Sequence, residues 1–126
     1  MSTKTLLIVI PVTLFFVWQL LPLIHARRMR GRTAPKPERL SPDTPDRLLY
    51  YFWSKHCGMC KSMTPIIQQL ARERNDIIAI DINDNMQLAR QFHVKATPTL
   101  VLVNNNKIEK VLLGAKSRKK ILSLLQ

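Results

Sequence analysis

The hydrophobic residues of this chain fall into two patterns, one near its start and one from residue 48 onwards. Residues 5–24, TLLIVIPVTLFFVWQLLPLI, form a run without a charge. At about 1.5 Å per residue, a helix of that length spans the roughly 30 Å hydrocarbon core of a bilayer. The run is longer than the apolar core of a cleavable signal peptide, and no clean small-residue cleavage site follows it. The pattern predicts one uncleaved transmembrane helix, with residues 1–26 as a single-pass membrane anchor.

From residue 48 the pattern becomes that of a globular domain, residues 48–126. Short apolar runs bounded by turn residues predict four strands, and apolar residues at helical spacing predict three helices. The three asparagines at 104–106 tolerate positive φ and predict a tight turn, and Ser117 is a suitable N-cap for the final helix. The predicted elements are strand 48–53, helix 58–74, strand 77–82, helix 86–92, strand 99–103, strand 107–113 and a helix that ends at 124–125.

This βαβαββα order predicts an α/β fold in which a mixed four-stranded sheet is flanked by helices. The first two strands are expected to be parallel and joined by a right-handed crossover, and the last two to form an antiparallel hairpin. The apolar residues of these elements are expected to form one core, made of Leu48, Tyr50, Phe52, Ile66, Leu70, Ile78, Ile80, Ile82, Leu88, Phe92, Leu100, Leu102, Val111, Leu113, Ile121 and Leu124.

Residues 27–47 read as a basic, proline-rich juxtamembrane linker. Four arginines follow the apolar run within eight residues, and four prolines lie among polar residues in 33–47. Such a stretch cannot bury a core, and proline keeps it extended. We therefore expect a semi-rigid spacer that holds the domain off the bilayer, with arginines that interact with anionic headgroups at about 1 kcal/mol each.

The charge distribution bears on partners and on topology. The net charge is +12, but half of this excess lies in residues 1–40, and the rest is scattered without a basic stripe interleaved with aromatic residues. Nucleic acid is therefore not expected as a partner. One lysine precedes the apolar run and the arginine cluster follows it, so the positive-inside bias predicts a cytoplasmic domain, anchored in a bacterial inner membrane. A periplasmic domain is the alternative, because folded domains are sometimes exported despite flanking charge.

Both cysteines of the chain lie in WSKHCGMCKSMTP, residues 53–65, where the first predicted strand meets the first long helix. A helix N-terminus stabilises a thiolate, so Cys57 is expected to be the exposed nucleophile and Cys60, one turn inward, the resolving thiol. His56 either adds positive potential beside Cys57 or is a solvated surface group. A four-thiolate metal site needs two more cysteines, and a structural disulfide across so short a loop removes little unfolded-state entropy. A redox couple without metal or other cofactor is the best account.

The stretch FWSKHCGMCKSMTP, followed by IIAIDIND and VKATPTLVLVNNNKIEKVLLGAKS, resembles the thioredoxin family over residues 48–125. The resemblance implies a thioredoxin-like fold and exchange of disulfides with protein substrates, served by an upstream redox donor or acceptor. It also implies that Pro98 follows a cis peptide bond and faces the CxxC motif, and that Thr97 presents its backbone to a substrate strand. The substrate groove implied in this way contains Trp53, His56, Gly58, Met59, Thr97, Pro98 and Gly114.

The chain also departs from the family pattern. The usual additional N-terminal strand and helix are replaced by anchor and linker. Tyr51 stands where the family has a buried aspartate, and Ala79 where its lysine partner often lies. The proton relay to the second thiol must therefore differ, with Tyr51 or water as substitutes. The Gly-Met pair between the cysteines means that a family reduction potential does not transfer, since such potentials span about 150 mV.

Taken together, these features predict a membrane-anchored thiol–disulfide oxidoreductase that works as a monomer. Its expected partners are protein thiols and disulfides, a redox donor or acceptor, and the lipid membrane. The alternative is a redox-inactive thioredoxin-like binding module, or a carrier of a soft metal such as Cu(I) that uses the two thiols.

Overall fold

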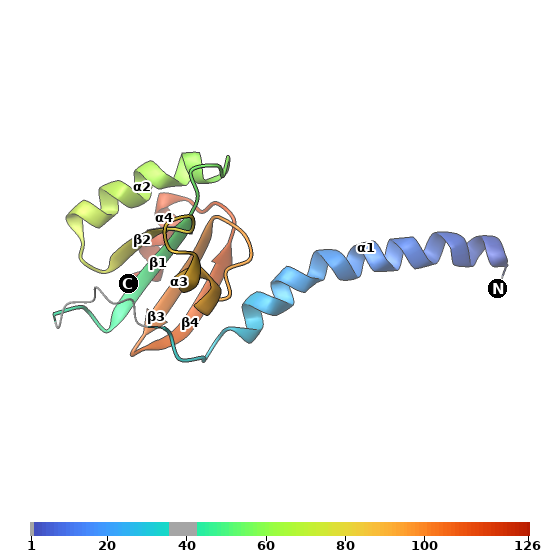
Figure 1. Cartoon of the computed structure of the whole chain (residues 1–126), viewed down its shortest axis with the longest axis horizontal. Coiled ribbons are helices and arrows are strands. Elements are labelled where there is room, and N and C mark those ends of the chain that lie inside the picture. The colour runs from blue at the N-terminus through green and yellow to red at the C-terminus, as the bar shows by residue number, and fades with distance from the viewer. Residues whose placement is uncertain (1, 36–42) are drawn as a thin grey trace.

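The structure is a computed structural model that describes residues 2–35 and 43–126 (Figure 1). After one long helix, the elements follow the predicted βαβαββα order. They are α1 (Thr3–Arg28), β1 (Arg47–Trp53), α2 (Cys60–Glu73), β2 (Ile77–Asp81), α3 (Met86–Gln91), β3 (Thr99–Asn104), β4 (Lys107–Leu113) and α4 (Arg118–Leu124).

The strands form a mixed four-stranded sheet in the order β2-β1-β3-β4. β1 is parallel to β2 and antiparallel to β3, and β3 pairs with β4 as an antiparallel hairpin, as expected. Asn105 and Asn106 form the turn of this hairpin with φ of 48° and 63°. These values lie in the left-handed region that asparagine tolerates, so the turn prediction is confirmed.

The core is divided between the two faces of the sheet, and the expectation of a single core is wrong. On one face Leu48, Tyr50 and Phe52 pack with residues from α3, and on the other Leu49 and Tyr51 pack with α2 and α4. The central strand is covered on both sides, so its apolar run is continuous rather than alternating. Several residues assigned to the core are only partly buried, namely Ile66, Ile78, Ile82, Leu88, Val111 and Leu113.

Local interactions explain where α2 and α4 begin. α2 presents a buried stripe of Met63, Ile67 and Leu70 to the sheet, and its first helical residue is Cys60 rather than residue 58. The preceding residues form a turn instead, in which the Cys57 N–H donates to the Ser54 carbonyl at 3.1 Å. At α4, the Ser117 side chain accepts a hydrogen bond from the backbone N–H of Lys120 at 3.3 Å, so the predicted N-cap is confirmed.

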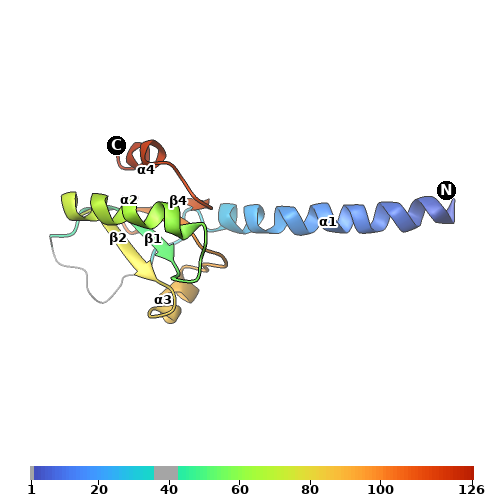
Figure 2. The ribbon, with the colours of Figure 1, turned by 90° about the horizontal axis from the view of Figure 1, so that it is seen from above.

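The N-terminal helix α1 projects away from the domain (Figures 1 and 2). Its stretch Thr3–His25 has 23 residues with a mean hydropathy of 2.4, which is long and apolar enough to cross a membrane, a property that signal sequences share. Its large apolar side chains are exposed, so no part of the domain covers them. Pro11 and Pro22 lie inside the helix.

The residues after α1 dock on the domain, which differs from the expected free spacer. Met29 and Ala34, each 4% exposed, are part of the core on the α3 face. The Gly31 N–H donates to the Ile108 carbonyl at 2.7 Å, and the Ile108 N–H donates to the Arg32 carbonyl at 2.8 Å. We call residues 29–35 the docked segment. Two of the four linker prolines, at 37 and 42, lie outside the described residues.

Candidate active site

The two cysteines form a disulfide at the start of α2, with their Cα atoms 5.3 Å apart. Cys60 is 1% exposed, whereas Cys57 is partly exposed. The backbone N–H of Cys60 donates to the Cys57 sulfur at 3.2 Å. A sulfur at this position faces the free N–H groups of a helix N-terminus, which stabilise negative charge on it. Because Cys57 precedes the helix and Cys60 is its first residue, the sequence-based estimate that Cys60 lies one turn inward is corrected.

Ser54 holds the loop that carries Cys57. Its side chain is buried, accepts a hydrogen bond from Asn83 Nδ2 at 3.1 Å and accepts another from the His56 backbone N–H at 3.3 Å. Asn83 is fixed in turn by Asp81, whose carboxylate accepts from its backbone and side chain at 2.9 Å. Sequence reasoning missed this support because Ser54 and Asn83 are far apart in the chain and share no motif.

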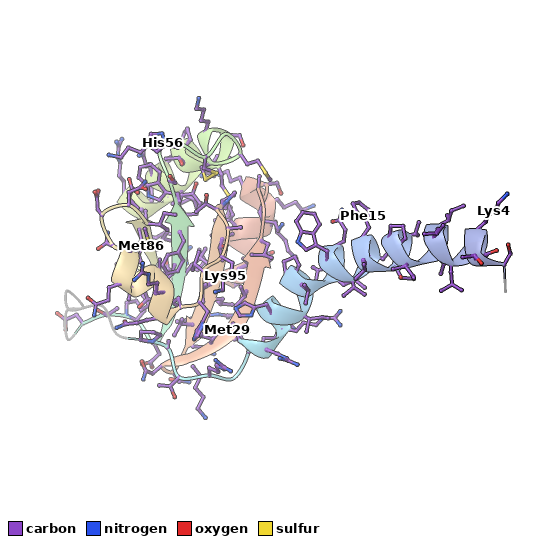
Figure 3. The ribbon with its side chains drawn as sticks, turned by 45° about the vertical axis from the view of Figure 1, so that its right-hand side comes forward. Lys4, Phe15, Met29, His56, Met86 and Lys95 are labelled. Atoms are coloured by element: carbon purple, nitrogen blue, oxygen red, sulfur yellow. A yellow bond between two sulfur atoms is a disulfide. The ribbon has the colours of Figure 1, made fainter. Side chains whose placement is uncertain are left out.

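A groove of about 230 Å³ lies beside the disulfide. Of the groove residues predicted from the sequence, Trp53 lines it, while His56, Gly58 and Met59 are exposed on the loop. His56, labelled in Figure 3, is not among the lining residues. The lining also includes Thr64, whose hydroxyl sequence reasoning did not consider. The complete lining is Trp53, Ser54, Lys55, Cys57, Cys60, Lys61, Thr64 and Pro65.

A second group of predicted residues meets the same loop from β3 and β4. The Thr97–Pro98 peptide bond is cis, as the resemblance implies, and Pro98 is buried. The Gly114 N–H donates to the Pro98 carbonyl at 2.9 Å, so the two residues are neighbours. Gly114 has φ of +79°, and a Cβ built on it would lie 3.6 Å from the terminal methyl of Met59. The structure therefore brings Pro98, Gly114 and the CGMC loop together.

Tyr51 occupies the position of the missing aspartate and is fully buried. Its hydroxyl lies 2.9 Å from the Thr64 hydroxyl, one helical turn after Cys60. Burial raises the pKa of Tyr51, and the hydrogen bond with Thr64 opposes this with a smaller effect. The phenol therefore stays protonated near neutral pH, where it can donate a hydrogen bond but cannot act as a base. Ala79 pairs with Tyr51 across β1 and β2 and supplies no charge.

The described residues bring no group of three or more histidine, cysteine, aspartate or glutamate side chains together as a metal site.

Comparisons with known proteins agree with this architecture. The family model described as Thioredoxin matches residues 40–126. The thioredoxin of Mycobacterium tuberculosis is 34% identical over 78 residues, which cover 60% of this chain and 67% of that protein. A bifunctional thioredoxin reductase/thioredoxin of Mycobacterium leprae is 31% identical over 78 residues, which cover 60% of this chain but only 17% of that protein.

Among solved structures, a mutant thioredoxin from Halobacterium salinarum NRC-1 superposes with a TM-score of 0.57 at 27% identity, covering 64% of this chain and 72% of that one. The matched family model extends over more than half of the sequence and includes both cysteines, Pro98 and Gly114. The chain therefore belongs to the thioredoxin family, whose members are thiol–disulfide oxidoreductases.

Proposed function

We propose that this chain is a membrane-anchored thiol–disulfide oxidoreductase that exchanges disulfides with other proteins. The observation that carries the proposal is the unequal accessibility of the two sulfurs at the start of α2. A substrate sulfur can reach Cys57, which is partly exposed, but not Cys60, which is 1% exposed. Such a pair allows a mixed disulfide to form at one sulfur and to be resolved by the other.

When the chain acts as a reductant, disulfide exchange proceeds in two steps. The Cys57 thiolate attacks one sulfur of a substrate disulfide, and the other substrate sulfur leaves as a thiolate. Cys60 then loses its proton and attacks the Cys57 sulfur, which releases the second substrate sulfur. Two electrons have passed to the substrate, and the Cys57–Cys60 disulfide remains for a dithiol donor to reduce.

The proposed anchor is α1, with the redox domain on the cytoplasmic face of a bacterial inner membrane. Supporting this, Arg27, Arg28, Arg30 and Arg32 follow the apolar stretch, whereas only Lys4 precedes it. Positively charged flanks are retained on the cytoplasmic side. There, cellular thiol pools keep such a cysteine pair reduced, so the protein works as a reductant.

Catalysis is tested by insulin reduction with dithiothreitol, using the full chain in detergent micelles. We expect turnover by the wild type and none by Cys57→Ser. Absence of turnover by the wild type would overturn the proposal and leave the redox-inactive binding module or soft-metal carrier as the better account.

Topology is tested separately by C-terminal fusions to alkaline phosphatase and to a fluorescent protein. A cytoplasmic domain gives a fluorescent fusion without phosphatase activity. Strong phosphatase activity with a dark fluorescent fusion would mean that the domain is exported.

A further inference from the structure

The docked segment fixes where the domain sits relative to the end of α1. His25, in the last turn of α1, packs edge-on against His93 with ring centroids 6.0 Å apart. Met29 inserts into the core beside the sheet, at the junction seen in Figure 3. Beyond it, the backbone hydrogen bonds of Gly31 and Arg32 to Ile108 continue the attachment. The helix and the domain are therefore joined by packed residues rather than by a free tether.

The same junction includes residues next in the chain to Pro98 and Gly114, which lie beside the CGMC loop. A cavity of about 20 Å³ lies between α1 and the sheet, and its walls include Pro22 and His25 from the helix and Thr99 and Leu113 from β3 and β4. Thr99 follows Pro98, and Leu113 precedes Gly114, in the chain. The end of α1 thus meets the chain neighbours of Pro98 and Gly114. The terminal methyl of Met59, in the CGMC loop, lies 3.6 Å from the position that a Cβ on Gly114 would take.

The ribbon views also show that the end of the domain with the cysteines is the end nearer to α1 (Figures 1 and 2). In Figures 1 and 2, α2 runs away from α1, so that its N-terminal end, where the cysteines lie, is the end nearer to α1. The loop between α3 and β3, which carries Pro98, also lies on this side of the domain. The opposite end of α2 points away from the anchor. The catalytic end of the domain thus faces the helix that we propose to cross the membrane.

The length of α1 determines how close to the bilayer the catalytic end of the domain lies. The apolar stretch Thr3–His25 has 23 residues. At about 1.5 Å per residue it measures roughly 35 Å, slightly more than the roughly 30 Å hydrocarbon core. Pro22 and His25 then lie at the headgroup boundary. Pro98 and Gly114, which adjoin the cavity residues Thr99 and Leu113 in the chain, lie close to the same level. Exposed Arg27 and Arg28, in the last turn of α1, add positive charge at this level, which anionic headgroups attract.

We propose that the substrate groove opens toward the lipid headgroups and selects disulfides of integral membrane proteins whose cysteines lie at the membrane boundary. This inference rests on the proposed function and narrows its substrate class. Met59 is 56% exposed within the CGMC loop, so its side chain is free to contact a substrate held there. The chemical step is the exchange written above, with the substrate disulfide held at headgroup level.

The test uses the full chain with Cys60→Ser in nanodiscs of phosphatidylcholine and phosphatidylglycerol. Two single-span probes carry one cysteine as a mixed disulfide with thionitrobenzoate. In the first, the cysteine directly follows the span; in the second, a rigid helical extension raises it about 30 Å above the membrane, which takes about 20 residues. We expect the boundary probe to form a mixed disulfide with Cys57 at least about tenfold faster.

A matched control tests whether the preference comes from the position of the domain at the membrane or from the reactivity of its cysteines. About 20 glycine and serine residues inserted after Arg28 keep the docked segment on the domain but free the domain from the helix, with a reach of about 25 Å. In the Cys60→Ser background, we expect the chain with the insertion to react with the two probes at similar rates. With Cys60 intact, we expect the chains with and without the insertion to reduce insulin equally fast. Equal rates for both probes without the insertion, or a preference that survives it, would overturn the inference.

Failure of the inference is distinguishable from failure of the proposed function. If the chain reduces insulin but does not prefer either probe, the groove does not open at headgroup level, while the proposed oxidoreductase activity stands. Loss of insulin reduction refutes the oxidoreductase itself.

A second measurement does not depend on turnover. In a Trp18→Phe background, Trp53 is the remaining tryptophan and lines the groove. We expect lipids with a spin label on the headgroup to quench Trp53 fluorescence, and the insertion after Arg28 to reduce this quenching at least about twofold. If spin-labelled lipids quench Trp53 fluorescence in neither the chain with the insertion nor the chain without it, the placement of the groove at headgroup level is wrong.

Discussion

Removing either partner of the hydrogen bond between Tyr51 and Thr64 should destabilise the fold, but by unequal amounts. Tyr51 is fully buried, whereas Thr64 is partly buried and lines the groove. Thr64→Val leaves the Tyr51 hydroxyl in the core without its partner at 2.9 Å, and an unsatisfied buried group costs about 1–3 kcal/mol. Tyr51→Phe leaves a threonine hydroxyl that water in the groove can reach, so the cost is closer to about 0.5–1.5 kcal/mol.

The double variant gives the sharper comparison. Replacing both partners removes the whole polar pair and keeps the shapes of the side chains nearly unchanged, which is often close to neutral. We therefore expect Tyr51→Phe/Thr64→Val to be at least as stable as Thr64→Val alone. The double-mutant cycle should show a coupling of about 1–2 kcal/mol between the two positions.

The measurement is urea unfolding of the full, oxidised chain in detergent micelles, followed by near-ultraviolet circular dichroism. Because the pKa of Tyr51 is raised, its hydroxyl is protonated at pH 6 and at pH 8, and the order of the variants should be the same at both. Equal costs for the two single variants, or strictly additive effects in the double variant, would refute the view that the buried Tyr51 hydroxyl depends on Thr64 for its hydrogen bond.

Three further outcomes follow from the site and the core. Cys60→Ser should accumulate mixed disulfides with substrate proteins on non-reducing gels, whereas Cys57→Ser should not; equal trapping would contradict the roles given to the two sulfurs. Burial raises the pKa of Tyr50 to about 12, so the native state holds a proton that the unfolded state loses near pH 10. The free energy of unfolding should therefore be unaffected by this group below pH 10 and fall between pH 10 and 12, by up to about 1.4 kcal/mol per pH unit, and the fall should be smaller in Tyr50→Phe. Ile121 is fully buried under the sheet, so Ile121→Ala should cost about 2–5 kcal/mol in urea unfolding, whereas Lys119→Ala on the exposed side of α4 should stay within about 0.5 kcal/mol.

The order and type of the elements could be predicted because each carries a local signal. Apolar runs, turn asparagines at 105 and 106, and the cap at Ser117 act within a few residues of the structure that they specify. The candidate site could be placed for the same reason, since the cysteine pair lies between a predicted strand and a predicted helix. The start of α2 was placed two residues early, because the turn before Cys60 depends on a hydrogen bond to the Ser54 carbonyl that periodicity does not reveal.

The two-sided core and the docked segment could not be read in this way. Whether Tyr51 faces a core depends on what covers the second face of the sheet, and α2 and α4 supply that cover only after the chain has folded. The docked segment is attached largely through backbone groups, which carry no residue-specific signal. Met29 is its main apolar contact, and one methionine among arginines gives no pattern. Thr64 was overlooked because its role depends on Tyr51, 13 residues earlier in the chain.

Pairing of residues 31–34 with β4 also bears on aggregation. An open strand edge offers unpaired backbone groups to a second molecule. Here the Gly31 and Ala34 N–H groups and the Arg32 carbonyl occupy the start of the β4 edge. A soluble fragment that begins after residue 42 would expose both that edge and the apolar site that Met29 fills. The residues that attach the domain to α1 thus also protect it from joining, strand to strand, with a neighbouring copy.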